Sequence, residues 1–281
     1  MIVHLVDGTY ELFRHFYGQR SFNKGNDKRF GAASGVLNSV LQMIDEGATH
    51  VGVATDHVIE SFRNDLYDGY KTGAGIERVL RAQFVPLEEG LAAMGVVVWP
   101  MVEYEADDAL ASAAYLANKD KKVLKVCIWT PDKDLAQSVR DDRIVQIDRR
   151  QKIIRDQEGV KKKFGVIPSL IPDYLALVGD SADGYPGIKG IGPKQAARLL
   201  NEFGPMEKFP KSVLGDKKEE ALLYKKLATL RSDIKLFKKT DELRWKGPTP
   251  AFDKFTKKIE EPKLLERAKK LADVIASREA E

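Results

Sequence analysis

Apolar runs of strand length alternate with helically spaced apolar positions through the first half of the chain. The runs occupy residues 2–6, 51–54, 96–99, 123–129 and 144–147. Between them, residues 32–46 and the Ala-rich residues 106–118 have the spacing that is typical of helices. We expect Pro100 to close the third run. Strands that alternate with helices predict an α/β fold, with a mostly parallel central sheet and flanking helices.

The second half of the chain keeps the helical spacing but loses the strand-like runs. Residues 193–203, 217–230 and 262–278 each predict a helix. This change predicts an α/β domain over residues 1–160 and a helical domain over residues 161–281. Residues 68–90 are glycine-rich at their start and predict a helix over 76–89. That segment fits either a cover over an active site or a plain surface connection.

The two halves also differ in charge. Residues 1–150 contain 18 Lys and Arg against 22 Asp and Glu, whereas residues 151–281 contain 28 against 20. A basic half suits a polyanion and an acidic half suits metal cations. The apolar N-terminal run is short, and no basic region precedes it, so we expect neither a signal peptide nor a membrane span. The single cysteine, Cys127, lies in an apolar run, which predicts a core residue and a cytoplasmic protein.

Three aspartates follow strand-like runs at equivalent positions. They are Asp7, Asp56 and Asp132. In open parallel sheets, ligands bind outside the carboxyl ends of the strands. One Asp after a strand is usually a turn residue or a helix cap. Three at equivalent positions predict acids gathered at one edge of the sheet.

Further acids come in closely spaced groups. The groups are Glu105, Asp107 and Asp108 at the start of a predicted helix, Asp132 and Asp134 after a strand, and Asp180 and Asp183. Capping explains one or two acids at a helix start, but not three. Two carboxylates about 4 Å apart repel by roughly 4 kcal/mol at an effective dielectric constant near 20. If the groups converge, hard divalent cations with oxygen ligands would neutralise them, and two such ions hydrolyse phosphodiesters.

Residues 187–204 combine three glycines with a predicted helix. Gly187, Gly190 and Gly192 permit a tight turn, and a proline then fits the first helical turn. Backbone N–H groups at that helix start would face a phosphate oxygen. Three cations would add positive charge: Lys189, Lys194 and Arg198. The segment predicts a grip on a nucleic-acid backbone that is blind to base sequence, with a turn used only for packing as the alternative.

Five stretches, in order, resemble the 5′-nuclease family, which includes the 5′–3′ exonuclease domain of bacterial DNA polymerase I and the flap endonucleases. They are residues 5–10 (LVDGTY), 61–63 with 69–71 (SFR and GYK), 104–108 (YEADD), 130–137 (TPDKDLAQ) and 173–183 (DYLALVGDSAD). The resemblance covers about residues 1–204. The chain leaves no room for a polymerase domain, so we expect a freestanding member of the family or a fragment of a longer one. The implied fold is a PIN-like sheet domain followed by a helical region with a helix–hairpin–helix motif.

The resemblance implies a role for each candidate residue. It implies a more buried metal cluster of Asp7, Asp56, Glu105, Asp107 and Asp108. It implies a second cluster of Asp132, Asp134, Asp180 and Asp183. Lys71 would stabilise charge on the cleaved phosphate, Arg14 would lie near that phosphate, and Tyr70 would stack on the terminal base. The turn at residues 187–192 would hold duplex DNA together with a K⁺ ion.

The implied activity is hydrolysis near the 5′ end of flap, nicked or overhang DNA, in primer removal or repair. The expected cofactor is Mg²⁺, with Mn²⁺ as the alternative, in two sites. The expected partner is branched or nicked DNA, including the RNA of RNA–DNA primers, bound by a monomer. Lys71 is followed by Thr-Gly-Ala-Gly rather than by arginine, which leaves open how a 5′ end passes residues 68–90.

Two other classes of function are weighed against this nuclease. A DNA-binding module that recognises branches without cutting would tolerate the loss of acids, so the intact acid set disfavours it. A PIN-like ribonuclease or a phosphatase would also use clustered aspartates. The glycine turn and the second acid pair disfavour both of these enzymes.

Overall fold

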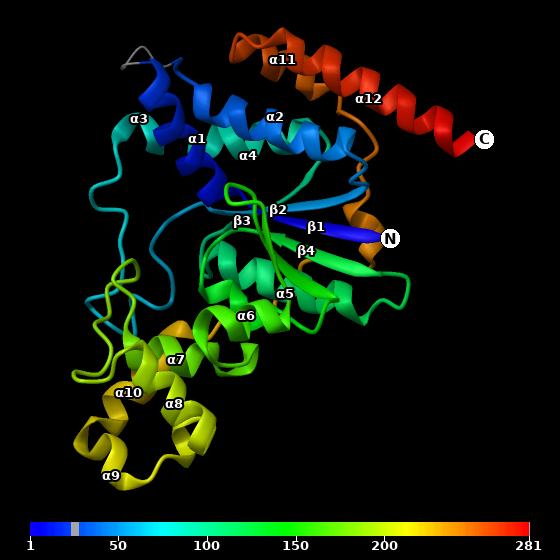
Figure 1. The fold of residues 1–281 in the computed structure, drawn as a ribbon. Helices are drawn as coiled ribbons and strands as arrows, with labels where there is room; N and C mark the ends of the chain where they lie inside the picture. Colours follow the sequence, from blue (N-terminus) through cyan, green and yellow to red (C-terminus); the bar gives the residue numbers. More distant parts are fainter. Residues whose placement is uncertain (24–27, 281) are drawn as a thin grey trace.

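A computed structural model describes residues 1–23 and 28–280, and its centre is one sheet (Figure 1). The described strands are β1 (Ile2–Asp7), β2 (His50–Asp56), β3 (Val97–Met101), β4 (Lys125–Trp129), β5 (Ile144–Asp148) and β6 (Ile153–Arg155). Their order across the sheet is β3-β2-β1-β4-β5-β6. Neighbours from β3 to β5 are parallel, and β6 pairs antiparallel with β5. The predicted mostly parallel sheet is therefore confirmed.

Helices cover both faces of the sheet. One face carries α1 (Gly8–Asn23), α2 (Gly31–Asp45) and α4 (Phe84–Ala93), and the other carries α5 (Ala106–Lys119). The central strands β1, β2 and β4 are mostly apolar, as expected for strands covered on both faces. Val36, Leu41 and Val53 belong to the core beneath α2, whereas Leu5, Ala109 and Ile128 belong to the core beneath α5. Cys127 is a buried free thiol, as predicted.

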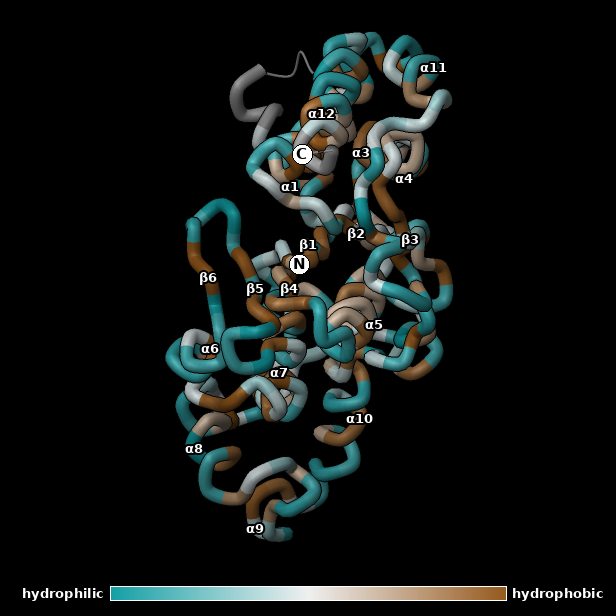
Figure 2. The backbone as a smooth tube through the Cα atoms, turned by 90° about the vertical axis from the view of Figure 1, so that its right-hand side faces the viewer, coloured by the Kyte–Doolittle hydropathy of each residue, from teal (hydrophilic) through white to brown (hydrophobic). Residues whose placement is uncertain are grey.

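A second lobe of short helices projects from the carboxyl edge of the sheet (Figure 1). It contains α6 (Gln157–Phe164), α7 (Ile171–Val178), α8 (Pro193–Phe203), α9 (Lys211–Leu214) and α10 (Lys218–Ala228). The lobe has a core of its own, in which Tyr174, Leu200 and Tyr224 are buried. Figure 2 shows this lobe below the strands, with hydrophilic segments on its outer turns.

The C-terminal residues return to the sheet-containing body. The backbone N–H of Trp245 donates to the carbonyl oxygen of Thr49, and its indole N–H donates to that of Met94 at 2.8 Å. Helices α11 (Ala251–Lys258) and α12 (Pro262–Ala280) then pack against α4 and α2. The region predicted as one helical domain, 161–281, therefore divides in space, because its last part shares a core with the α/β body.

Two predictions about the bounds of elements are wrong. Strand β3 continues through Pro100, which is tolerated because β3 is an edge strand. The helix predicted over 76–89 is two helices, α3 (Arg78–Arg81) and α4, and α4 packs inside the body against α2. The sequence pattern did not predict the short strand β6 or the helix α1. No helix among the described residues is long and apolar enough to cross a membrane.

Candidate active site at the carboxyl edge of the sheet

The strand-end aspartates meet at one edge because their strands are parallel. Asp7 closes β1 and Asp56 closes β2, and the register places Asp7 beside Ala54 of β2. Asp7 is buried; its carboxylate accepts the Tyr10 N–H at 2.8 Å and the Thr130 hydroxyl at 3.0 Å. Thr130 directly follows β4, so the ends of β1 and β4 are tied together at this carboxylate.

The start of α5 brings further acids to the same edge. Asp56 Oδ1 accepts the backbone N–H of Ala106 at 2.8 Å, where the unsatisfied N–H groups of the helix favour an anion. Glu105 immediately precedes the helix and is buried. Its carboxylate accepts Ser61 Oγ at 2.7 Å and contacts Lys71 Nζ at 2.7 Å. Burial acts to raise the pKa of Glu105, but Lys71 and Arg63 outweigh it and lower that pKa.

Asp108 differs from the other acids of the α5 start, because both of its oxygens are fully engaged. Arg63 donates to Oδ2 at 2.7 Å and to Oδ1 at 2.8 Å, and the backbone N–H groups of Glu105 and Arg231 donate as well. The residue is 0% exposed. Asp108 therefore lies behind the site as the partner of Arg63, and no oxygen is left for a cation.

The second group of acids is compact. Asp134, Asp180 and Asp183 are buried, and each offers a carboxylate oxygen within 4.8 Å of the others. Asp134 Oδ1 is a buried atom with no hydrogen-bond partner among the described residues. Asp132 is exposed at the rim, where its Oδ1 accepts the N–H of Asp134 at 2.9 Å. An unpartnered buried oxygen among three carboxylates fits a divalent cation, which prefers oxygen ligands.

Two lysines neutralise part of this negative charge. Lys71 Nζ lies 2.7 Å from Glu105 and 2.9 Å from Asp183, so it bridges the acids of α5 and those of the second group. Lys133 Nζ lies 2.9 Å from Asp180. The Lys71 segment approaches Asp183 closely because Gly184, at φ 90°, has no side chain; a Cβ there would collide with the Gly69 carbonyl.

The remaining carboxylates are poorly compensated. Burial, followed by repulsion from Asp56 and Asp132, raises the pKa of Asp7 to about 7. Burial and neighbouring Asp132 also raise the pKa of Asp107 and of Asp134 well above the ordinary value. These acids cannot all be ionised near neutral pH without added positive charge. The donor set contains only oxygen atoms, which suits hard divalent cations.

Two residues predicted near the substrate are placed differently. The Tyr70 ring is 3% exposed and packs in the core of the helical lobe, with its hydroxyl 3.4 Å from Glu105. The Tyr70 ring is therefore covered by protein in this structure, and its stacking on a base stays a prediction. Arg14 lies on α1, and its guanidinium donates to Glu11 at 2.6 Å rather than to any of the grouped acids.

The glycine turn directly follows the segment that carries Asp180 and Asp183. Gly187 is buried at φ 72°, and a Cβ there would collide with the backbone of Gly179. Gly190 is in open space at φ 91°, and Gly192 precedes α8. The three predicted cations are exposed: Lys189, Lys194 and Arg198. Arg198 contacts Glu202 at 3.3 Å, an exposed pair that DNA could easily displace.

Several residues of the site had no predicted role. Arg63 lies in the stretch 61–63 that resembles the 5′-nuclease family, and that resemblance was the sequence signal for it. Glu88 on α4 holds both neighbours of Asp56, because it accepts Thr55 Oγ1 at 2.8 Å and lies 2.8 Å from His57 Nδ1. Asp148 closes β5 and is buried, so the rule for strand-end aspartates would also have found it.

Acids gathered where a parallel sheet ends fit a metal-dependent enzyme that hydrolyses phosphate esters. Comparison with known families agrees with this class. Residues 2–165 match the model of the 5′-3′ exonuclease N-terminal resolvase-like domain, and residues 166–251 match that of the 5′-3′ exonuclease C-terminal SAM fold. The chain belongs to the 5′-3′ exonuclease family.

Individual relatives and structures are similar over most of the chain. A 5′-3′ exonuclease of Buchnera aphidicola subsp. Baizongia pistaciae is 34% identical, with 87% of this chain and 86% of the relative covered. One from Aquifex aeolicus is 33% identical, with coverages of 92% and 91%. The fold is similar to that of the T5 5′-exonuclease with bound zinc, at a TM-score of 0.67, 20% identity and coverages of 92% and 98%. It also resembles the catalytic core of Rad2 in complex with DNA substrate, at a TM-score of 0.61, 16% identity and coverages of 95% and 89%.

Proposed function

We propose that this chain is a structure-specific 5′ nuclease that cuts near the 5′ end of flap, nicked or overhang DNA, in primer removal or repair. The observation that carries the proposal is the junction of two acid groups through Lys71, whose Nζ lies within 2.9 Å of both Glu105 and Asp183. A single phosphate at Lys71 would face both groups at once. The products would be a 5′-phosphate and a 3′-hydroxyl.

The chain's own residues would divide the work. Asp7, Asp56, Glu105 and Asp107 would hold one divalent ion, and Asp134, Asp180 and Asp183 would hold another, with Asp132 at the rim beside both. Divalent ions held there would supply an activated water and stabilisation of the leaving oxygen. Lys71 would stabilise the developing charge on the phosphate. Arg14, on the helix that begins directly after Asp7, would meet the DNA on the far side of β1 from the lobe.

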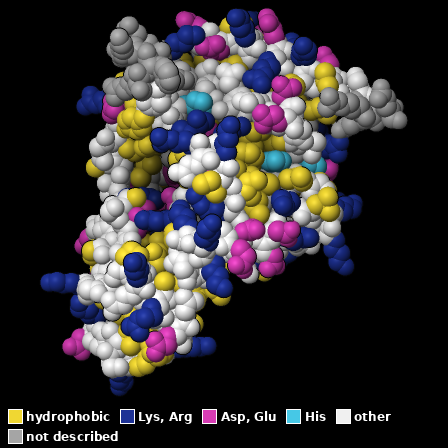
Figure 3. Space-filling model, viewed as in Figure 1, with side chains coloured by type: hydrophobic (Ala, Val, Ile, Leu, Met, Phe, Trp, Pro, Cys, Tyr) yellow, Lys and Arg dark blue, Asp and Glu magenta, His cyan; other side chains and the backbone are white. Residues whose placement is uncertain are grey.

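The helical lobe would hold the duplex. The N–H groups at the start of α8 and the exposed Lys189, Lys194 and Arg198 would contact backbone phosphates, with Gly187, Gly190 and Gly192 allowing a close approach. Carbonyl oxygens of that turn would suit a K⁺ ion. Figure 3 shows Lys and Arg side chains gathered between the body and the lobe, where a bound duplex would cross. We place the enzyme in the cytoplasm as a monomer, with Mg²⁺ or Mn²⁺ as its cation and primer RNA within its substrate range.

Cleavage of a labelled 5′-flap DNA tests this function. We expect products that require Mg²⁺ or Mn²⁺, disappear in EDTA and carry a 5′-phosphate. Asp132→Ala should lose most of the activity while its thermal unfolding stays cooperative, whereas Asp142→Ala, a matched change at an exposed aspartate after β4, should retain it. Single-stranded RNA and a small phosphoester serve as competing substrates. The proposal fails if the wild type leaves the flap intact in every metal, or prefers either competitor.

A further inference from the structure

Lys133 lies between Asp132 and Asp134 in the sequence, on the turn that follows β4. Its Nζ lies 2.9 Å from Asp180 Oδ2, and its side chain is 35% exposed, whereas that of Asp180 is 3% exposed. Lys71 pairs with Asp183 of the same group. Each lysine therefore occupies a different carboxylate of a group that also offers an unpartnered oxygen on Asp134.

An open cavity of about 510 Å³ adjoins Lys133. Its wall includes Gly179, Ser181 and Gly184 from the turn that carries the second acid group, and Ser181 and Gly184 are exposed. The Ser181 hydroxyl can donate into this space, whereas the N–H groups of Gly179 and Gly184 already donate to the carbonyl oxygens of Leu175 and Asp180. Asp180 also lines the cavity, so the space suits a phosphate oxygen once the charge of Asp180 is neutralised, with Lys133 and Ser181 as its donors.

We propose that Lys133 is a substrate-contacting residue, held by Asp180 in the cation-free enzyme and released onto a backbone phosphate of the DNA next to the cleaved bond. The argument rests on the proposed nuclease function. A divalent ion at Asp134, Asp180 and Asp183 would take the Asp180 oxygen that Lys133 now contacts and would repel its ammonium. The lysine stem is flexible, so the ammonium would turn into the cavity, where a DNA phosphate supplies the missing negative charge.

DNA binding at several salt concentrations tests the phosphate contact. The probe is an uncut 5′-flap DNA, measured with Ca²⁺ and again with EDTA, and a gel confirms that it stays intact. Each lost phosphate contact lowers the slope of log Kd against log salt by about 0.9. We expect Lys133→Met to lose about that slope, and about tenfold in affinity, with Ca²⁺ but not with EDTA. Lys133→Arg should keep both.

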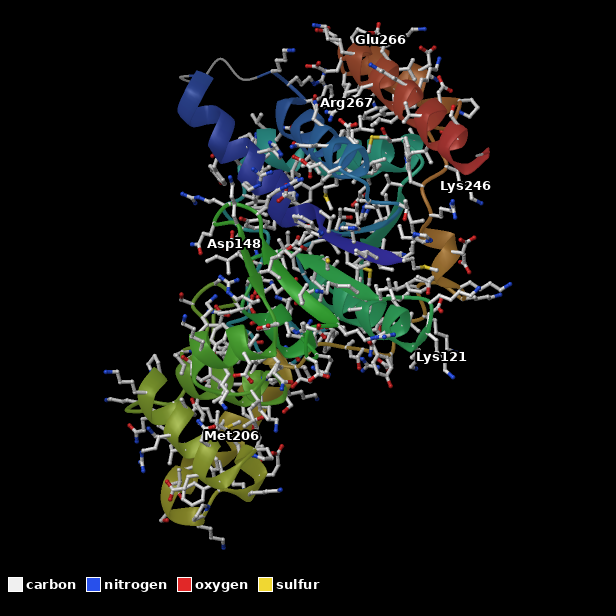
Figure 4. All side chains as sticks on the ribbon, turned by 45° about the vertical axis from the view of Figure 1, so that its right-hand side comes forward. Lys121, Asp148, Met206, Lys246, Glu266 and Arg267 are labelled. Atoms are coloured by element: carbon white, nitrogen blue, oxygen red, sulfur yellow. The ribbon has the colours of Figure 1, made fainter. Side chains whose placement is uncertain are left out.

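Cation binding without DNA tests the release step. Since Lys133 competes for Asp180, Lys133→Met should bind Mn²⁺ about threefold more tightly by calorimetry. Lys121→Met is the matched control: Lys121 is exposed at the amino end of β4, at the opposite end of the sheet from Asp148 (Figure 4), and should change neither measurement. If Lys133→Met does not fold, Lys133→Gln removes the charge while keeping a donor for Asp180.

The outcomes are separable. An unchanged salt slope with Ca²⁺ would show that Lys133 is only a permanent partner of Asp180, and an equal loss of slope in EDTA would overturn the release step. Mn²⁺ binding that is unchanged or weakened would also overturn it. Wild-type flap cleavage in Mg²⁺ is measured in the same series, so failure of the lysine proposal is distinguished from failure of the nuclease function.

Discussion

Replacing Arg63 by methionine tests whether the acids behind the active site depend on one buried cation. The Arg63 side chain is 1% exposed and donates to Asp108 twice, to Glu105, and to the carbonyl oxygens of Leu227 and Thr229. Methionine fills a similar volume but leaves the Asp108 carboxylate without a counter-charge. Removing one partner of a buried ion pair costs about 3–5 kcal/mol.

We therefore expect Arg63→Met to lower the free energy of unfolding by about 4 kcal/mol and the melting temperature by roughly 8–16 °C. Urea titrations followed by circular dichroism in EDTA measure the change, and an unaltered m value shows that the unfolded state is comparable. A loss below about 1 kcal/mol would refute the reasoning, because the pair would then be no stronger than one exposed to solvent.

The double variant Arg63→Met, Asp108→Leu separates charge from packing. Apolar replacement of both partners of a buried pair is often neutral, so most of the lost stability should return. If none returns, the hydrogen bonds to Leu227 and Thr229 dominate instead. Asp108→Asn, which keeps Arg63 beside Glu105, should still cleave flap DNA in Mg²⁺, whereas Asp107→Asn should lose most of the activity.

Three further outcomes follow from the site. Gly184→Ala should cost more than about 1 kcal/mol of stability and lower cleavage, because its Cβ meets the Gly69 carbonyl. Gly47→Ala, at φ 106° in open space, should show backbone strain alone, and equal losses of cleavage in the two variants would contradict this. Tyr70→Ala should lower the free energy of unfolding by about 3–5 kcal/mol, because the ring is buried. Tyr70→Phe should cleave at a near-normal rate. A raised KM with normal stability in Tyr70→Ala would instead indicate base stacking. The pKa of Asp7 is raised to about 7, so the folded, metal-free protein keeps a proton that the unfolded chain loses above about pH 4. Its stability should fall from pH 5.5 to 7.5 in EDTA, and saturating Mg²⁺ should remove that fall in thermal unfolding; a rise in EDTA would refute the sign.

The strand-end acids could be predicted from sequence because one geometric rule places them. Parallel strands end at a common edge, so Asp7 and Asp56 had to meet wherever their strands paired. The helices of the second half were also predictable from spacing, and α8 spans the predicted residues 193–203. In both cases the prediction needs only the pattern of neighbouring residues and a general rule of packing.

The rest depended on contacts between distant segments. Asp107 and Asp108 are adjacent aspartates, so the sequence alone does not show that their surroundings differ. The difference comes from Arg63, which lies 45 residues before Asp108 and donates to its carboxylate. Tyr70 lies in a segment without periodicity, so nothing local indicated that its ring is buried. The return of Trp245 to the body likewise rests on partners about 150 and 200 residues earlier, Met94 and Thr49.

The three cations of the site differ in exposure, and this difference explains how one fold serves both a metal-free and a loaded state. Arg63 is 1% exposed and bonded on all sides, so it is a fixed counter-charge that secures Glu105 and Asp108. Lys71 and Lys133 are 30% and 35% exposed, and each pairs with an acid through a flexible stem. A buried guanidinium cannot leave without the cost worked out above, whereas a partly solvated ammonium on a flexible stem leaves its partner at a smaller cost. Without metal, these cations balance part of the charge of the acids. Once divalent ions take over that role, Lys71 and Lys133 would be free to turn towards a phosphate.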